Sequence, residues 1–302
     1  MNLLIQGVRA AELGTGDIAR TATFYTQVWG LAKTAETAEA VYLRGTAGTH
    51  NILTLRRGMP SIRRLVFQAR SEAALGELHA RIRAAGLAVS ERIGPLGEPD
   101  GSIGFDSRDP EGRTITFAWD AAGANTAPST APADRFTRIT HFNLNSGAYD
   151  IMRGYMRDVL GFRVIDETAS NGFFNCDRDH HALVIGRTPM APTLNHIAFE
   201  MPDLDSMMRM CGTMREHGYP IEWGVGRHGP GDNVFAYFAG PEEMPIECTA
   251  EVLRVDAGYA YRGPDQWRFP PGRTDQWGVT GPPSERIKRI QKQFAFAELP
   301  LR

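Results

Sequence analysis

The 302-residue sequence predicts an α+β fold of four tandem βαβββ modules, paired into two domains with cup-shaped mixed sheets. The first supporting observation is repetition, because four stretches of roughly 60 residues share the order strand, helix and short strands. The second is that FYTQVWGL and GYMRDVLGFRV are similar amphipathic helices that end in glycine. The third is a connector at 121–136, rich in Ala, Pro, Ser and Thr, which places the domain boundary at about residue 130.

The first two modules fall within residues 1–130, the predicted N-terminal domain. The first module opens with a strand at 7–13 and a helix from about 17 to 29, followed by the strands AVYLRG and NILTLRR. The second opens with a strand at 62–68 and a helix from about 72 to 85, followed by IGFDS and RTITFAW. Both modules therefore begin with a strand and a helix and end in a small antiparallel group of strands.

The other two modules belong to the predicted C-terminal domain, residues 131–302. The third module opens with the strand RITHFNL and a helix at about 148 to 160, followed by FRVIDET, FFNCD and HALVIGR. The fourth opens with the strand LNHIAFE and a helix from about 204 to 217, followed by IEWGVG, VFAYFA and PIECTAE. Asp203 is a plausible N-cap of that last helix, and Gly218 ends it.

A long extension follows the fourth module from about Val252 onward. It contains Trp267, Phe269 and Trp277 among many Pro and Gly residues, and SERIKRIQ near its end is typical of a short capped helix. The extension is expected either to wrap the mouth of a site or a neighbouring subunit, or to form an ordered surface segment; loop statistics do not separate these alternatives.

Composition excludes several classes of partner. The 33 basic and 35 acidic residues give a net charge of −2, so no field would recruit nucleic acid or an anionic membrane. No apolar stretch approaches the roughly 18 to 20 residues that cross a bilayer, and the start lacks a basic region followed by a long apolar run. The three cysteines, Cys176, Cys211 and Cys248, lack CxxC spacing and are expected to be packing thiols in a reducing compartment. The chain is accordingly expected to be cytoplasmic.

Three polar residues sit at the centres of predicted strands in the C-terminal domain. His141, His196 and Glu247 would converge if the two modules curl around a common cup. Two imidazoles and one carboxylate form the ligand set of an open-sided ferrous site. Glu200 shares a strand face with His196, but four residues of strand separate them by roughly 13 Å, too far to share one ion.

Each histidine also has an ordinary interpretation. A single histidine in a strand is more often a hydrogen-bonded core or surface residue than a metal ligand. Three other histidines are assigned to that ordinary class: His50, His79 and His217. His217 lies at a helix C-terminus, where a partial positive charge on the imidazole interacts favourably with the helix dipole. The metal hypothesis therefore depends on several residues having the right joint spacing.

The segments ITHFNLN, CDRDHHALVIG, LNHIAFEM, GVGRHGPGDNVFAYF and PIECTAE supply that joint spacing. Across residues 137–251 the chain resembles the type I extradiol ring-cleaving dioxygenases, such as the catechol and dihydroxybiphenyl dioxygenases, of the vicinal oxygen chelate superfamily, which has a glyoxalase-like fold. The resemblance implies that Fe(II) is bound by the three strand-centre residues, and the sequence leaves open whether Mn(II) can replace it. It also implies that three further residues act on the substrate: His181, His228 and Tyr237.

The implied reaction inserts both atoms of O2 into a substituted catechol and opens the ring beside the diol. Tyr237 and His228 would hydrogen-bond the substrate oxygens, and His181 would stand beside the bound oxygen as a proton donor. The implied partners are a catecholic small molecule and O2, and the enzyme is expected to be a homo-oligomer. Asp232 is a possible substrate contact, and four phenylalanines could form an aromatic wall or belong to the core: Phe142, Phe173, Phe174 and Phe235.

The N-terminal domain resembles the same module but keeps no ligand set. Aligning the repeats places Ala10 opposite His141, and Arg64 and Thr116 opposite the other two ligands. A structural role is therefore expected for this half. One alternative is a metal-dependent isomerase or lyase, which the missing N-terminal ligands weaken. The other is a metal-free aromatic- or drug-binding protein, which would have no reason to keep six site residues in register.

Overall fold

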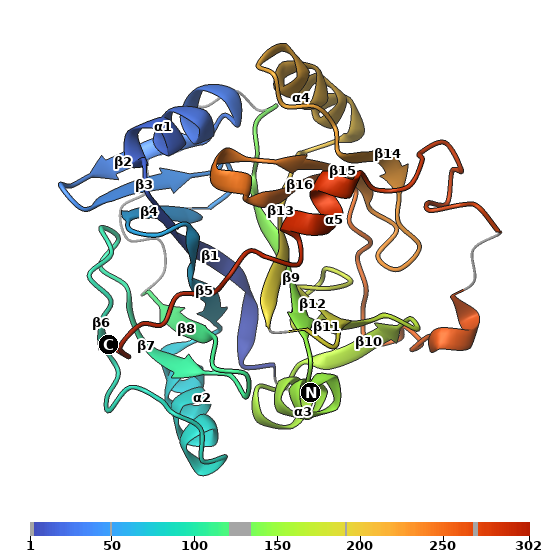
Figure 1. Cartoon of the computed structure of the whole chain (residues 1–302). Helices are drawn as coiled ribbons and strands as arrows, with labels where there is room; N and C mark the ends of the chain where they lie inside the picture. Colours follow the sequence, from blue (N-terminus) through green and yellow to red (C-terminus); the bar gives the residue numbers. More distant parts are fainter. Residues whose placement is uncertain (1–2, 49, 121–133, 191, 268–270) are drawn as a thin grey trace.

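Two eight-stranded mixed sheets form the molecule in this computed structural model, which describes residues 3–48, 50–120, 134–190, 192–267 and 271–302 (Figure 1). The strand orders are β2-β3-β4-β1-β5-β8-β7-β6 and β10-β11-β12-β9-β13-β16-β15-β14, so the two sheets have the same topology. The predicted fold of tandem βαβββ modules is thereby confirmed. The predicted connector, apart from its last three residues, and the boundary near residue 130 lie outside the described residues.

The N-terminal sheet is built from the first half of the chain. Its elements are β1 Ile5–Thr15, α1 Ile18–Thr23, η1 Phe24–Val28, β2 Ala32–Glu36, β3 Ala40–Arg44, β4 Leu53–Arg57, β5 Ser61–Ala69, α2 Glu72–Ala84, β6 Gly94–Pro95, β7 Ile103–Arg108 and β8 Thr114–Trp119. Two of these strands, β2 and β6, were not predicted from the sequence. Both are edge strands, and the exposed side chains of β2 leave little hydrophobic pattern to detect.

The C-terminal sheet repeats this plan and carries the extension. Its elements are β9 Arg138–Ser146, α3 Tyr149–Gly154, η2 Tyr155–Val159, β10 Arg163–Glu167, β11 Asn171–Asn175, β12 Leu183–Arg187, β13 Thr193–Glu200, α4 Leu204–Glu216, β14 Trp223–Arg227, β15 Val234–Ala239, η3 Pro241–Glu243, β16 Pro245–Ala250, η4 Pro264–Gln266 and α5 Glu285–Ile290. Each predicted helix and strand of this half is present, with ends that differ by a few residues.

Helix ends follow the signals in the sequence. Asp203 accepts a hydrogen bond from the backbone N–H of Ser206 at 2.7 Å, and Ser284 caps α5 in the same way. The first helix of each half turns into a single π-helical segment and stops before Gly30 or Gly161, with φ of 81° and 80°. Only glycine adopts this left-handed conformation without strain, so the repeated glycine ends both helices at equivalent places.

Two β-bulges change which side chains share a face in the central strands. The pairing of β13 with β9 slips between Ala198 and Phe199 and again between Leu194 and His196. Simple alternation predicts Ile139 on the face of His141, but the extra residue between them places Ile139 in the hydrophobic core instead. The bulges therefore let core residues precede the site residues along each strand.

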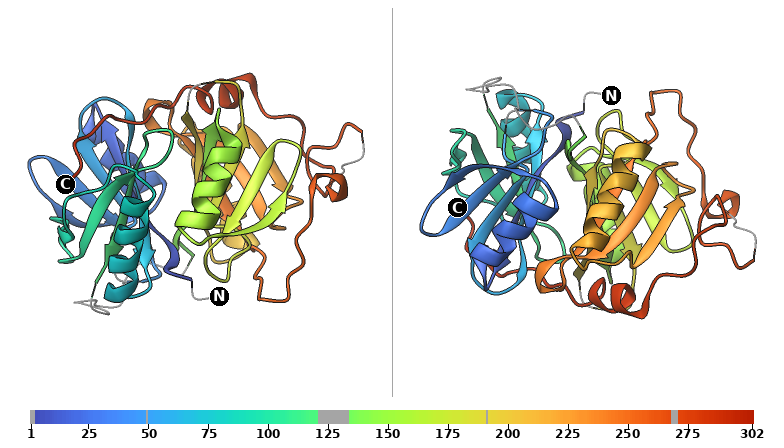
Figure 2. Two further views of the ribbon diagram at one scale, coloured as in Figure 1. Left: turned by 90° about the horizontal axis from the view of Figure 1, so that it is seen from below. Right: turned by 90° about the horizontal axis from the view of Figure 1, so that it is seen from above.

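The helices lie between the two sheets, and the open faces of the sheets point away from each other (Figure 2). Aromatic side chains fill this shared layer, because Trp29 stacks on Phe136 with ring centroids 4.3 Å apart and Phe67 packs edge-on against Phe142 at 5.8 Å. One hydrophobic cluster thus spans both halves. The three cysteines are free and buried, as expected for packing thiols. No helix in the described part of the chain is long and apolar enough to cross a membrane.

The extension crosses from the C-terminal sheet to the N-terminal sheet. It passes the open side of the C-terminal sheet, forms α5 and then returns along the N-terminal half (Figure 2). The backbone groups of Ile62 exchange hydrogen bonds with Ala295 and Ala297, at 2.9 and 2.7 Å. The Arg302 guanidinium finally enters the open face of the N-terminal sheet, 3.1 Å from Asp106.

Candidate metal centre

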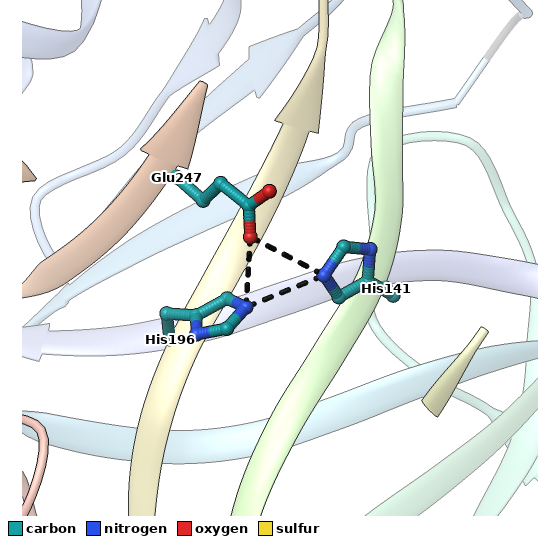
Figure 3. Close-up of side chains that lie close together, drawn as sticks. All are labelled: His141, His196 and Glu247. Carbon is teal, nitrogen blue, oxygen red and sulfur yellow. Dashed lines mark hydrogen bonds and ion pairs between the residues drawn. The ribbon is translucent and has the colours of Figure 1, made fainter. Parts of the chain in front are cut away.

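Three neighbouring strands bring His141, His196 and Glu247 together (Figure 3). Glu247 Oε2 lies 2.9 Å from His196 Nε2 and 3.4 Å from His141 Nε2, and the two Nε2 atoms are 3.3 Å apart. All three residues are buried, with at most 3% of their surface exposed. The candidate ligands predicted from the sequence therefore converge on one point, which faces a cavity.

Hydrogen bonds on the far side of each imidazole aim its Nε2 lone pair at this point. His196 Nδ1 is 2.9 Å from Asn195 Oδ1, which only accepts, so Nδ1 carries the proton. The Asn195 amide is held in this orientation because its nitrogen donates to Asn145 Oδ1 at 3.2 Å. His141 Nδ1 lies 2.7 Å from the Thr140 hydroxyl. Such outer partners are typical of histidines that bind metal through the other nitrogen.

The Glu247 carboxylate has one satisfied and one unsatisfied oxygen. Oε1 accepts a hydrogen bond from the Asn233 amide at 3.2 Å, whereas the buried Oε2 accepts none. Burial opposes ionisation, but a proton on the Nε2 of His141 or His196 outweighs it and holds the pKa of Glu247 well below its usual range, and a bound cation would take the place of that proton. A buried anionic oxygen facing two nitrogen lone pairs is costly without a cation. The donor set therefore fits a divalent metal with three protein ligands and open positions.

A cavity of about 440 Å³ adjoins these ligands. His181, His228 and Tyr237, the three residues predicted to act on the substrate, all line it. Its wall also contains polar side chains without formal charge, such as Asn143 and Gln291. The structure thus places five of the six candidate site residues on the cavity wall, with Glu247 directly behind in contact with His196 and His141.

His181 packs directly against a candidate ligand, with its ring centroid 4.3 Å from that of His141. It is buried, and burial together with the neighbouring imidazoles lowers its pKa well below the usual value. His181 is therefore neutral at ordinary pH. Its Nδ1 contacts His180, a residue for which the sequence analysis assigned no role although the His-His pair was in view.

His228 and Tyr237 form a second pair on the cavity wall. The distance from His228 Nε2 to the Tyr237 hydroxyl is 3.0 Å, and Phe235 stacks on the imidazole at 3.9 Å between centroids. Burial lowers the pKa of His228 to about 4 and raises the pKa of Tyr237 well above its usual value, where Glu247 adds to the effect. Both groups are consequently neutral and able to exchange hydrogen bonds with a ligand.

Other candidates lie away from the cavity. Glu200 pairs with Arg138 at 2.7 Å, in agreement with its exclusion as a ligand. Asp232 is half exposed and bonds to Gln276, so it does not line the cavity. The remaining ordinary histidines also lie outside the cavity: His50, His79 and His217.

The aromatic candidates divide between wall and core. Phe173 lines the cavity, whereas Phe142 and Phe174 are fully buried in the core. Trp267 of the extension is also part of the wall, which favours the interpretation that the extension wraps the site mouth. Trp223 is a wall residue that the sequence analysis missed, because an aromatic residue at a strand start carries no signal of its own. Phe269 lies outside the described residues.

The N-terminal sheet has no equivalent cavity in its described residues. The space there measures about 20 Å³, because charged side chains occupy the cup. Arg64 lies 2.9 Å from Glu12 and 3.2 Å from Asp106, and Arg302 closes the group at 3.1 Å from Asp106. This half is filled by its own ion pairs.

Comparisons with known proteins agree with the repeated fold. Residues 7–117 and 138–248 each match the family model of the Glyoxalase/Bleomycin resistance protein/Dioxygenase superfamily. The chain is 28% identical over 131 residues to Metapyrocatechase 2 of Cupriavidus necator, covering 42% of this chain and only 41% of that relative. It is 23% identical over 298 residues to a metapyrocatechase of Geobacillus stearothermophilus, covering 88% and 87% of the two chains.

Solved structures extend the comparison. The Mn(II)-bound glyoxalase from Novosphingobium aromaticivorans is 30% identical with a TM-score of 0.85, covering 94% of each chain. A substrate complex of homoprotocatechuate 2,3-dioxygenase from Brevibacterium fuscum has a TM-score of 0.81 at 22% identity, covering 95% and 92%, which is a likeness of fold. Because both repeats match the family model, the protein belongs to the Glyoxalase/Bleomycin resistance protein/Dioxygenase superfamily.

Proposed function

We propose that the protein is an Fe(II)-dependent extradiol dioxygenase that opens the ring of a substituted catechol beside its diol. The observation that carries the proposal is the buried group of His141, His196 and Glu247, open on the side where His181, His228 and Tyr237 line a cavity. The relatives named metapyrocatechase support the same reaction class. When bound, a ferrous ion would bring catechol and dioxygen together and pass electrons between them.

The chain's own residues would bind and orient the substrate. The Tyr237 hydroxyl and His228 Nε2 are 3.0 Å apart, so one catechol oxygen can be hydrogen-bonded by either group. Neutral His181 can hold or move a proton at its Nε2, because its Nδ1 is engaged by His180. Trp223 and Phe173 on the cavity wall exclude water and offer aromatic faces to a flat ring.

The cavity wall favours a neutral substrate. None of the lining residues within the described ranges is a lysine or an arginine, so no fixed cation would pair with a carboxylate on the ring. The volume of about 440 Å³ falls in the usual range of ligand pockets and exceeds what one small ring needs. A catechol with an uncharged aryl or alkyl substituent is therefore the expected substrate, and a carboxylated catechol such as 3,4-dihydroxyphenylacetate is expected to react more slowly.

A second candidate is a metal-dependent isomerase or lyase, because the Mn(II)-bound glyoxalase is similar over nearly the whole chain. Such an enzyme would use the same metal ligands but would not consume oxygen. The proton-exchanging groups on the cavity wall, His181, His228 and Tyr237, are compatible with either chemistry. Oxygen uptake therefore separates the two candidates directly.

The test is anaerobic loading of the full chain with Fe(II), followed by air and a panel of catechols. The expected result is about one iron per chain, oxygen uptake and a yellow ring-opened product. Mn(II) loading and the hemithioacetal of a 2-oxoaldehyde form the second arm, which would show isomer formation without oxygen uptake if the protein is an isomerase. Iron binding with no catechol consumed would contradict the dioxygenase proposal.

A further inference from the structure

We propose that Asp166 and His180 are positioning residues that fix the tautomer of His181 at the cavity. The inference deepens the proposed function and rests on it, because His181 is the group that would exchange a proton with the reacting oxygens. Neither Asp166 nor His180 lines the cavity, so both act through His181.

His180 bridges the other two side chains inside the protein. Its Nδ1 lies 3.1 Å from His181 Nδ1, and its Nε2 lies 2.9 Å from Asp166 Oδ2. Asp166 and His180 are fully buried, and His181 is 2% exposed. Hydrogen bonds in such an interior have fixed partners, because water does not compete for them.

The carboxylate of Asp166 is held by donors from the extension. Its Oδ1 accepts the backbone N–H of Arg262 at 2.9 Å, and its Oδ2 accepts the Tyr259 hydroxyl at 2.9 Å. The Arg262 guanidinium stands 3.5 Å from Oδ2 and balances the charge. An ionised carboxylate only accepts hydrogen bonds, so His180 Nε2 must carry the proton that it shares with Asp166.

The tautomer of His181 follows from this direction. An imidazole that carries its single proton on Nε2, shared with Asp166, has an acceptor at Nδ1, and the guanidinium of Arg262 supplies the positive charge beside the carboxylate. The contact at 3.1 Å then requires His181 Nδ1 to donate. His181 therefore keeps its Nε2 lone pair free, as an aspartate does for the histidine of a catalytic triad.

The N-terminal repeat shows that the fold does not require this arrangement. Register pairs β12 with β9 at Leu183 and Phe142, and β4 with β1 at Leu53 and Ala11, so His180 and His181 correspond to His50 and Asn51. Asp166 faces Phe173 as Ala35 faces Tyr42. The carboxylate and the second imidazole are thus absent from the half that has no ligand set.

The test is ¹⁵N NMR of histidine-labelled full chain, metal-free and loaded with diamagnetic Zn(II), in which ring nitrogen shifts report the tautomer. Wild type is expected to show His181 as the Nδ1–H form, assigned by the signals lost in His181→Gln. Asp166→Asn places an amide donor against His180 and is expected to convert His181 to the Nε2–H form. Tyr261→Phe, which removes a nearby hydroxyl bonded to Glu167 and leaves every contact of Asp166 and His180 in place, is the control and is expected to keep the wild-type tautomer.

Kinetics with the Fe(II) enzyme add a second readout. Asp166→Asn is expected to lower kcat for the catechol by about 10- to 100-fold with KM changed less than about 3-fold, whereas Tyr261→Phe stays within about 2-fold of wild type. His180→Phe removes the contact altogether and is expected to lose kcat similarly, which covers the case that Asp166→Asn does not fold.

The proposal is overturned if His181 is the Nε2–H form in wild type, or if Asp166→Asn leaves both the tautomer and kcat unchanged. Wild type that cleaves no catechol would overturn the proposed function alone, because the NMR measurement still decides the tautomer without turnover.

Discussion

The two halves of the molecule share one backbone plan and differ in what fills their cups. In the C-terminal half, Ala198 pairs with His141 on one side and with Glu247 on the other. In the N-terminal half, Val66 pairs in the same way with Ala10 and Thr116. The alignment of the repeats that placed these residues opposite each other is therefore confirmed by strand register.

The β-bulges are repeated as well. The pairing of β1 with β5 slips between Val8 and Ala10 and between Glu12 and Leu13, at positions equivalent to the slips beside His141 and His196. The backbone of a ligand site thus exists in both halves, but Arg64 and its ion pairs occupy one of them. The difference shows that the fold provides the positions, whereas a few side chains decide whether an open cavity forms.

The largest effect is expected from Glu247→Gln, which removes the anionic ligand and should weaken divalent metal binding by more than about 100-fold. The matched control is Thr116→Ser at the equivalent place in the N-terminal sheet, which should leave binding unchanged. Titration with Fe(II) or Mn(II) under anaerobic conditions measures both. Equal affinity in wild type and Glu247→Gln would show that the metal binds elsewhere.

The next effect is expected from Arg64→Ala in the N-terminal cup. Glu12 and Asp106 would lose a buried partner, so the free energy of unfolding should fall by about 3 to 5 kcal/mol. Denaturant unfolding gives this value, and metal affinity of the folded protein should stay the same. A large loss of metal affinity without loss of stability would contradict the assignment of metal binding to the C-terminal half and of a stabilising role to Arg64.

A smaller effect is expected from Arg302→Ala, which withdraws the guanidinium from buried Asp106 while Arg64 remains. The loss should be about 1 to 3 kcal/mol in unfolding free energy. Arg209→Ala is the control, since this arginine belongs to an exposed pair and should cost less than about 1 kcal/mol. Similar losses of unfolding free energy in the two variants would show that Arg302 contributes no more to stability than an exposed arginine.

The smallest effect is a pH dependence of the N-terminal ion pairs. Burial opposes ionisation of both carboxylates. Arg64, Arg56 and Arg63 outweigh it and lower the pKa of Glu12, and Arg302 and Arg64 do so for Asp106. Groups with a depressed folded pKa contribute stability above their unfolded values, about 4.3 and 3.9, and lose it as pH falls below them. Unfolding between pH 6 and 3 should show a shallower acid loss in Asp106→Asn than in wild type.

Much of the fold and the candidate ligand set could be predicted because they leave local or repeated signals. The order of strands and helices follows hydrophobic periodicity, and His141, His196 and Glu247 stand out as polar residues at strand centres. The family resemblance supplied the roles proposed for the other site residues. The prediction from simple alternation that Ile139 shares a face with His141 was wrong. A β-bulge inserts one extra residue between them, and nothing in the alternation of polar and apolar residues marks it.

Long-range contacts could not be predicted in the same way. Asp166 meets His180 from a neighbouring part of the sheet, and Arg302 reaches Asp106 across 196 positions of the chain. Nothing in one sequence marks such partners, because each is an ordinary polar residue until the topology brings them together. The ion pairs that occupy the N-terminal cup could therefore not be predicted, although the absence of a metal-ligand set from that half was predicted.

The extension gives the molecule a thermodynamic linkage between its halves. One segment walls the cavity at Trp267 and Gln291, pairs with Ile62, and ends among the ion pairs of the other cup. A ligand that contacts this wall binds only when the N-terminal half, which holds the end of the extension, is folded, so ligand binding and the folding of that half are coupled. Local opening of that distant half would release the wall, so the lifetime of the cavity is set in part by a half whose described residues form no candidate ligand set.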